Sequence, residues 1–260
     1  MATSEIWTSQ TEEYVKLGLF ILSKEHKTLQ EFSTWINNRL KNYFIEKTDE
    51  ITTETFEIIQ PTLSRYLSGK IGISQKKGSV LLKLIDKELN MTKIIMDKIQ
   101  EFSTDNWVSI NTRVILTDIT FLTFIVIKKI LQSNDFSTID AIVTPEADGI
   151  PLGVILAQEL QCKCIYVRKN KRSEDTDFVQ VEVQRYRNVV NYYLSKKELP
   201  PDSKVLLVDD IKRSGSTLKH LEELIEKAES RVIKKMVLID IKSEGDKIKN
   251  VDSFLELKSN

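Results

Sequence analysis

The sequence predicts an α/β fold: a mostly parallel sheet flanked by helices in the C-terminal part, preceded by a helical N-terminal domain. Short apolar runs at residues 140–144, 164–167 and 204–209 are separated by segments of helical spacing, as in alternating strand–helix units. The centres of these runs are continuously apolar, which is typical of parallel strands buried on both faces. In the first hundred residues, by contrast, apolar residues recur at helical spacing.

The same patterns predict individual elements. In the C-terminal part we expect helices at residues 115–131, 151–160 and 217–228 and strands at 140–144, 164–167, 204–210 and 232–241. In the N-terminal part we expect one helix from Leu29 to Leu40. Another begins at Pro61, whose missing N–H costs nothing there, and stops near Gly69. We therefore predict two domains, residues 1–105 and residues 106–260.

The charges balance overall but not locally. Lys+Arg and Asp+Glu each number 38, which excludes a protein that coats nucleic acid through a general positive surplus. Residues 61–100 nevertheless contain eight basic and three acidic residues, whereas residues 46–60 contain one basic and five acidic residues. The composition therefore leaves room for a localised contact with nucleic acid.

The sequence favours a cytoplasmic protein with no membrane partner. The first residues lack a basic region followed by an apolar core, so we expect no signal peptide. The apolar segment from Thr112 to Ile130 is interrupted by four charged residues, which indicates a buried helix. Cys162 and Cys164 stand alone in the sequence, and we interpret them as small buried side chains in a reducing compartment.

The most informative stretch follows the apolar run at residues 204–209. Asp209 and Asp210 end this strand, and after Arg213 the chain passes through residues 214–217 (Ser-Gly-Ser-Thr) into a helix. Small and hydroxyl residues at a helix start form an anion cradle, because N–H groups point at the ligand and the helix dipole favours negative charge. The paired carboxylates can accept hydrogen bonds from a diol or hold a hydrated divalent ion. An ordinary helix cap after a strand is the alternative, and it does not account for the paired acids.

This pattern resembles the phosphoribosyl pyrophosphate (PRPP) signature of type I phosphoribosyltransferases: an apolar strand, two acidic residues and a Ser/Thr-Gly loop. Residues 144–153 (TPEADGIPLG) are similar to the family's pyrophosphate loop, and residues 167–172 (VRKNKR) to the basic segment after the next strand. Residues 173–186 then correspond to the family's mobile hood. The resemblance covers roughly residues 110–240.

The resemblance implies that the chain binds PRPP together with Mg2+. Asp209 and Asp210 would contact the ribose hydroxyls and, through PRPP, the Mg2+. The Ser-Gly loop would hold the 5-phosphate, and the upstream loop and basic segment would meet the pyrophosphate. The residues assigned to PRPP binding are Glu146, Ala147, Asp148, Gly149, Arg168, Lys169, Lys171, Arg172, Asp209, Asp210, Lys212, Arg213, Ser214, Gly215, Ser216 and Thr217.

Some positions depart from the family's enzymes. At Arg213, oxopurine-specific members have an Asp that acts as general base and adenine-specific members have a small residue, whereas an arginine cannot accept a proton at neutral pH. Ser216 replaces a common Gly, and residues 174–177 place three acids where an orotate-type enzyme has a catalytic Lys. The sequence thus supports PRPP binding more strongly than transfer, and the catalytic residue is unknown.

Residues 60–70 (QPTLSRYLSGK) carry a separate signal. Three apolar side chains can face a core, while the others are mostly short and polar with one Arg, which suits base edges and phosphates in a major groove. The stretch resembles the recognition helix of helix-turn-helix repressors, although residues 41–59 replace the expected tight turn. A polar-faced structural helix is the alternative. The residues assigned to DNA binding are Gln60, Thr62, Ser64, Arg65, Ser68 and Lys70.

Two functions fit these observations. The first is a DNA-binding transcriptional regulator of nucleotide metabolism, similar to purine-operon repressors, which senses PRPP or a nucleotide and binds double-stranded DNA as a homodimer. The alternative is an active phosphoribosyltransferase that joins a purine or an orotate/pyrimidine base to PRPP. A protein that uses the PRPP domain only as a scaffold is the third interpretation.

Overall fold

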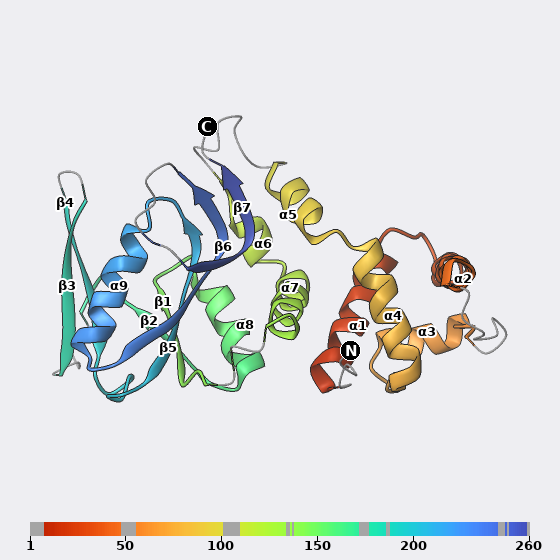
Figure 1. The fold of residues 1–260 in the computed structure, drawn as a ribbon, viewed down its shortest axis with the longest axis horizontal. Helices are drawn as coiled ribbons and strands as arrows, with labels where there is room; N and C mark the ends of the chain where they lie inside the picture. The colour runs from red at the N-terminus through yellow and green to blue at the C-terminus, as the bar shows by residue number, and fades with distance from the viewer. Residues whose placement is uncertain are drawn as a thin grey trace. The chain divides into compact units, whose positions relative to one another are not determined.

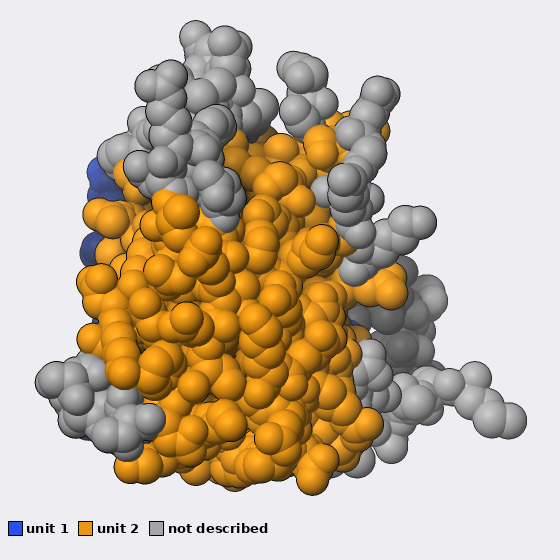
Figure 2. Space-filling model, turned by 90° about the vertical axis from the view of Figure 1, so that its left-hand side faces the viewer, with its two compact units in different colours: residues 1–94 blue, residues 95–260 orange. Residues whose placement is uncertain are grey.

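The computed structural model describes residues 8–47, 56–100, 110–133, 136, 138–171, 177–185, 188–243, 248 and 250–258. The chain divides into two compact units, residues 1–94 and residues 95–260, which Figure 2 distinguishes by colour. The boundary predicted between residues 105 and 106 falls within residues 101–109, which lie outside the described part of the chain, so it stays a prediction.

The N-terminal unit is helical, as the apolar spacing predicts. It contains α1 (Ser9–Ser23), α2 (Leu29–Lys47), α3 (Gln60–Leu67), α4 (Gln75–Glu88) and the first turn of α5 (Met91–Gln100). Gly18 lets α1 approach α4 closely, because a Cβ there would meet Ile85 at 2.6 Å. The Tyr14 hydroxyl donates to Asp86 at 2.7 Å and ties the same two helices, and burial together with Asp86 raises the pKa of Tyr14.

The C-terminal unit is built on a five-stranded sheet in the order β2-β1-β5-β6-β7, with every neighbouring pair parallel. Its strands are β1 (Ala141–Pro145), β2 (Lys163–Val167), β5 (Lys204–Lys212), β6 (Arg231–Lys242) and β7 (Val251–Lys258). All five residues of β1 are buried, which agrees with its mainly apolar sequence. The predicted parallel α/β fold is confirmed.

Helices cover both faces of the sheet (Figure 1). On one face lie α7 (Ile119–Leu131) and α8 (Ile150–Leu160), and on the other lies α9 (Ser216–Lys227). Next to α9 packs a separate antiparallel hairpin of β3 (Phe178–Arg185) and β4 (Asn188–Ser195), which contributes Val181, Val183, Tyr192 and Leu194 to the core. The sequence patterns predicted neither this hairpin nor β7.

One predicted helix is two helices in the structure. The expected helix at residues 115–131 is divided into α6 (Arg113–Leu116) and α7. The reason is Asp118, whose side chain accepts the N–H of Phe121 at 3.1 Å and so begins a new helix. Among the described residues, no helix is long and apolar enough to cross a membrane.

The two cysteines are free and half-buried. Burial is the main cause that raises the pKa of Cys164, to about 11. Both thiols therefore stay protonated at neutral pH, although both side chains are half-buried and not fully buried as the sequence predicted.

Strand order determines where a ligand can bind. From β1 the chain crosses through α8 to β2 on one side, and later returns to β5 on the other side of β1. The direction of crossing therefore changes between β1 and β5, and open α/β sheets bind ligands in the crevice beyond the carboxyl ends of such strands. The loops that follow β1, β2 and β5 all leave from this edge.

Candidate functional site

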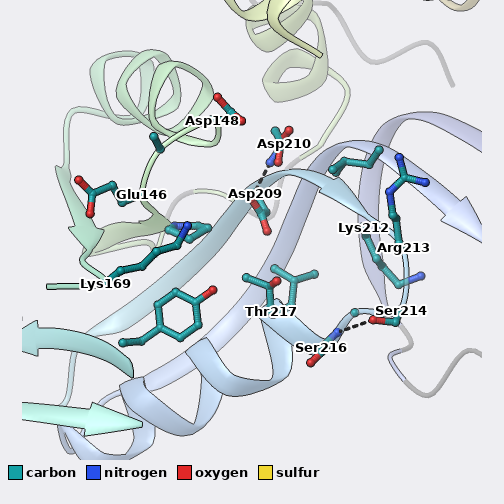
Figure 3. A pocket seen from close by; sticks show the side chains of 16 residues that line it. Glu146, Asp148, Lys169, Asp209, Asp210, Lys212, Arg213, Ser214, Ser216 and Thr217 are labelled. Atoms are coloured by element: carbon teal, nitrogen blue, oxygen red, sulfur yellow. Dashed lines mark hydrogen bonds between the residues drawn. The ribbon is translucent and has the colours of Figure 1, made fainter. Parts of the chain in front are cut away.

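A cavity of about 630 Å3 opens at this edge of the sheet (Figure 3). It brings together the loop after β1, the segment after β2, one residue of β4 and the connection from β5 into α9. Its lining residues are Pro145, Glu146, Ala147, Asp148, Lys169, Tyr192 and residues 209–218. Twelve of the sixteen residues that the sequence assigned to PRPP therefore lie in one place, although they are separated by up to 71 positions in the chain.

The connection from β5 into α9 has the geometry of an anion-binding loop. Gly215 has a φ of +72°, which favours glycine, and α9 begins directly after it at Ser216. A Cβ on Gly215 would also meet the Ile248 side chain at 2.6 Å, so the loop is covered closely from behind. The first turn of α9 contains no acidic residue, so its N–H groups present an electropositive end to the cavity.

Asp209 and Asp210 extend to different sides of β5 (Figure 3). Asp209 is buried and accepts the main-chain N–H of Asp210 on Oδ1 at 2.9 Å. Asp210 is half-buried and accepts the Thr112 hydroxyl on Oδ2 at 2.7 Å. Both carboxylates are thus held in fixed orientations at the edge of the cavity.

The loop after β1 approaches β5 closely. Gly149 is the residue that permits this approach, because a Cβ there would overlap the Thr144 hydroxyl and come within 3.3 Å of the Asp209 Cα. Glu146 donates its main-chain N–H to Val167 at 2.9 Å, which anchors the loop to β2. The main chain at residues 146–148 therefore forms one wall of the cavity, opposite the α9 loop.

The basic residues assigned to the pyrophosphate occupy different positions. Lys169 lines the cavity. Arg168 instead lies 4.6 Å over the Tyr166 ring and donates to its hydroxyl, and the Lys171 ammonium lies 4.0 Å over the Phe178 ring. Arg172 lies outside the described residues, as do residues 173–176 and 186 of the segment assigned to the hood, whereas residues 178–185 of that segment form β3.

Lys212 is held by a buried ion pair. Its ammonium donates to Asp240 at 2.8 Å, and both side chains are at most 1% exposed. Lys242 approaches the second oxygen of Asp240 at 2.7 Å, and that hydrogen bond is the main cause that raises the pKa of Lys242. The positive charge of Lys212 is therefore neutralised inside the protein, while Arg213 is exposed at the cavity.

The structure adds three residues that the sequence patterns did not identify. Tyr192, 1% exposed, lines the cavity from β4. Thr112 and Arg113, at the start of α6, contact Asp210 and Asp148. The β-branched and aromatic residues at 189–194 contained a signal for β4, but no local pattern links Thr112 to an acid 98 positions away.

The α9 loop, the paired acids and the open parallel sheet define an α/β protein whose strand ends have the geometry of a phosphate site. The family model of the phosphoribosyl transferase domain matches residues 115–259, more than half of the chain, and the chain belongs to that family. The N-terminal unit lies outside the matched residues.

The chain is similar to adenine and xanthine phosphoribosyltransferases. The chain is 32% identical over 126 residues to the adenine phosphoribosyltransferase of Mycoplasmoides gallisepticum, which covers 46% of this chain and 70% of that protein. It is 32% identical over 89 residues to the xanthine phosphoribosyltransferase of Heliobacterium modesticaldum, which covers 34% of this chain and 47% of that protein. It is also similar to the crystal structure of the Thermoanaerobacter pseudethanolicus adenine enzyme, with a TM-score of 0.55 at 18% identity over 64% of this chain and 99% of that one. At that identity the likeness shows the fold alone.

Proposed function

We propose that this protein binds PRPP and transfers its ribose 5-phosphate group to a purine base, releasing pyrophosphate. In this reaction the bond from C1 of the ribose to the pyrophosphate oxygen breaks, a bond from C1 to a ring nitrogen forms, and the base loses a proton. One observation carries the proposal: a single cavity joins an anion-binding helix start, two oriented carboxylates and a close main-chain loop. The adenine and xanthine enzymes among the relatives support a purine as the acceptor.

Each part of the cavity suits one part of PRPP. The N–H groups and hydroxyls of residues 214–217 suit the 5-phosphate, because the start of α9 favours negative charge. Asp209 and Asp210 accept hydrogen bonds from the two ribose hydroxyls. The main chain at residues 146–148 and the Lys169 ammonium face the pyrophosphate.

The donor set also fits Mg2+ carried by PRPP. Among the described residues no three His, Cys, Asp or Glu side chains form a cluster that holds a metal by itself. Two neighbouring carboxylates and a diphosphate suit Mg2+, which keeps several waters and binds through one or two carboxylates plus phosphates. Asp209 and Asp210 are the side chains that would hold it, and it would neutralise the charge of the departing pyrophosphate.

The cavity favours catalysis by positioning and charge. Arg213 cannot accept the proton of the base, because a guanidinium stays protonated at neutral pH. Its exposed cation instead adds to the positive field of the phosphate loop. Fixed donors aimed at the developing negative charge of pyrophosphate stabilise the transition state without any rearrangement.

Pyrophosphate release tests this proposal. The full chain with PRPP and Mg2+ is assayed against adenine, guanine, xanthine, orotate and uracil. We expect release with one purine and its loss in the double variant Asp209→Asn/Asp210→Asn, which keeps size and removes charge. Absence of turnover with every base would reject the transfer step. Retained PRPP binding by the double variant would reject the assigned carboxylate roles.

A second function, a DNA-binding regulator that senses PRPP or a nucleotide, is supported by the surface of α3. Leu63 and Tyr66 are buried, whereas Gln60, Ser64 and Arg65 on the same helix are exposed. Of the other assigned residues, Ser68 and Lys70 are exposed just beyond the helix and Thr62 is half-buried. A short helix that buries its apolar side and presents polar tips has the form of a groove-reading element.

Binding to a randomised duplex library tests the second function. Selective binding that weakens with salt is the expected result for a regulator. No binding at low salt would reject it and leave the transferase proposal untouched. The homodimer and the cytoplasmic location remain predictions.

A further inference from the structure

The side chains of Thr112 and Arg113, at the start of α6, bind acidic residues of the cavity and do not cap their own helix. A Thr before a helix commonly caps it by accepting an N–H with its hydroxyl. Here the Thr112 side chain makes no such cap, and Asn111 accepts the N–H of Arg113 at 3.2 Å instead. The Thr112 hydroxyl donates to Oδ2 of Asp210 at 2.7 Å, and the residue is only 4% exposed.

This contact fixes the rotation of the Asp210 carboxylate. One oxygen is held by Thr112, and the main-chain N–H of Asp210 is in turn held by Asp209 at 2.9 Å. A carboxylate that receives ligand hydroxyls binds most strongly when its orientation is set beforehand, because the ligand then does not bear the entropy of ordering it. Thr112 supplies that order from a segment outside every family motif in this sequence.

The next residue acts on the opposite wall of the cavity. The Arg113 Nε donates to Oδ1 of Asp148 at 3.1 Å, and Asp148 lines the cavity beside the proposed pyrophosphate position. A carboxylate at that place repels a diphosphate, and a paired guanidinium offsets the repulsion. Arg113 itself is not among the described residues that line the cavity, so it acts through Asp148.

We propose that Thr112 and Arg113 are positioning residues of the PRPP site: Thr112 orients Asp210, and Arg113 neutralises Asp148. The inference rests on the proposed PRPP site, and it assigns to two consecutive residues at the start of α6 the orientation of one cavity acid and the neutralisation of another. It places part of the affinity for a ribose diphosphate in the segment that joins the N-terminal unit to the sheet.

Calorimetric titration of the full chain with PRPP and Mg2+ tests the role of Thr112. We expect Thr112→Val to weaken PRPP binding about tenfold, the range for a lost hydrogen bond to a charged group, and Thr112→Ser to restore it. Thr117→Val is the matched control, because that hydroxyl donates to the main chain of Arg113 and not to an acid. Equal weakening by Thr112→Ser, or wild-type affinity in Thr112→Val, would overturn the role.

A double-mutant cycle tests the role of Arg113. Arg113→Gln should weaken PRPP binding up to about fivefold, since the pair is exposed, and have no effect when Asp148→Asn is already present. Continued weakening in the Asp148→Asn background would show that Arg113 contacts the ligand directly, and would overturn neutralisation. Circular dichroism melting of each variant shows whether a loss of affinity comes from unfolding. If the wild type itself binds no PRPP, the proposed function fails together with this inference, whereas wild-type binding with unaffected variants rejects the inference alone.

Discussion

The α9 loop (residues 213–217) and the end of α3 each contain a glycine in the same backbone conformation. The first glycine is closely packed, whereas the second is open to solvent. Gly215 has a φ of +72° and Gly69 a φ of +68°. A Cβ on Gly215 would meet Ile248 at 2.6 Å, whereas a Cβ on Gly69 would have nothing within 4 Å. The loop lies against packed side chains and next to a buried ion pair, while the polar end of α3 is open. The first region can therefore hold a ligand in a fixed geometry, and the second suits contacts that depend on charge and salt.

Removal of the buried charge beside the loop should have the largest effect. Asp240→Asn leaves the Lys212 ammonium buried without its anionic partner, which should lower the free energy of unfolding by about 3–5 kcal/mol. Urea denaturation measures this change. The control is Asp252→Asn, which breaks the more exposed pair with Lys234 and should cost at most about 1 kcal/mol. Equal losses in the two variants would remove the contrast between buried and exposed charge.

Substituting each of the two glycines by alanine measures how much the surroundings of each position add to the cost of a Cβ. Gly69→Ala should cost about 1 kcal/mol, the penalty of a positive φ for a residue with a Cβ. Gly215→Ala should cost about 1–3 kcal/mol more, because Ile248 or the loop must shift. Thermal unfolding compares the two variants. An equal cost at both positions would show that Ile248 moves aside freely.

The stability of the N-terminal unit should depend on pH through the ionisation of Glu12. Its carboxylate pairs with Lys16 and accepts the N–H of Ile73, and the Lys16 hydrogen bond is the main cause that lowers the pKa of Glu12 below 4.5. A lowered folded-state pKa means that this contribution is present above pH 4.5 and is lost as pH falls below it. Glu12→Gln should therefore lower stability by about 1 kcal/mol at pH 7 and less at pH 3. Denaturation at the two pH values measures this, and a pH-independent difference would contradict it.

The smallest stability effect should come from the exposed face of α3. Arg65→Ala should change the free energy of unfolding by no more than about 0.5 kcal/mol. In the second proposed function it should also weaken DNA binding and reduce the salt dependence by about one counterion. Lys83→Ala, an exposed cation on α4, is the matched control for a general charge effect. Equal DNA affinity in wild type and Arg65→Ala would place any recognition elsewhere.

Local patterns in the sequence were sufficient for the sheet and for much of the cavity. Short apolar runs identified β1, β2, β5 and β6. In β1 and β5 the central apolar residues are buried on both faces and show no polar alternation, whereas β2 lies at the edge of the sheet, where Lys163 and Tyr166 are exposed. The loops after β1 and β5 were predicted from the small residues that follow each strand. Since parallel strands bring their carboxyl ends to one edge, these loops meet in the cavity.

Contacts between distant residues could not be predicted in this way. The sequence predicted that the Lys212 cation binds PRPP, but the fold brings it to Asp240, 28 positions away. Asp118 reads as one charge within an apolar helix, yet its side chain begins α7. Arg168 and Lys171 lie over aromatic rings that the basic segment itself does not reveal.

Because β1 and β5 are adjacent strands, they also limit the size of a ligand that can contact the loops after both of them. These strands are hydrogen-bonded partners, with Val143 opposite Leu207, and such strands lie about 4.8 Å apart. The span between the two loops is therefore set by backbone geometry, which side-chain substitution hardly changes. A compact sugar with an anionic group at each end can contact both loops at once, whereas a ligand with one phosphate can engage only one. In the proposed function, selection for doubly charged sugars would thus be a property of the sheet, and the surrounding side chains would adjust the affinity.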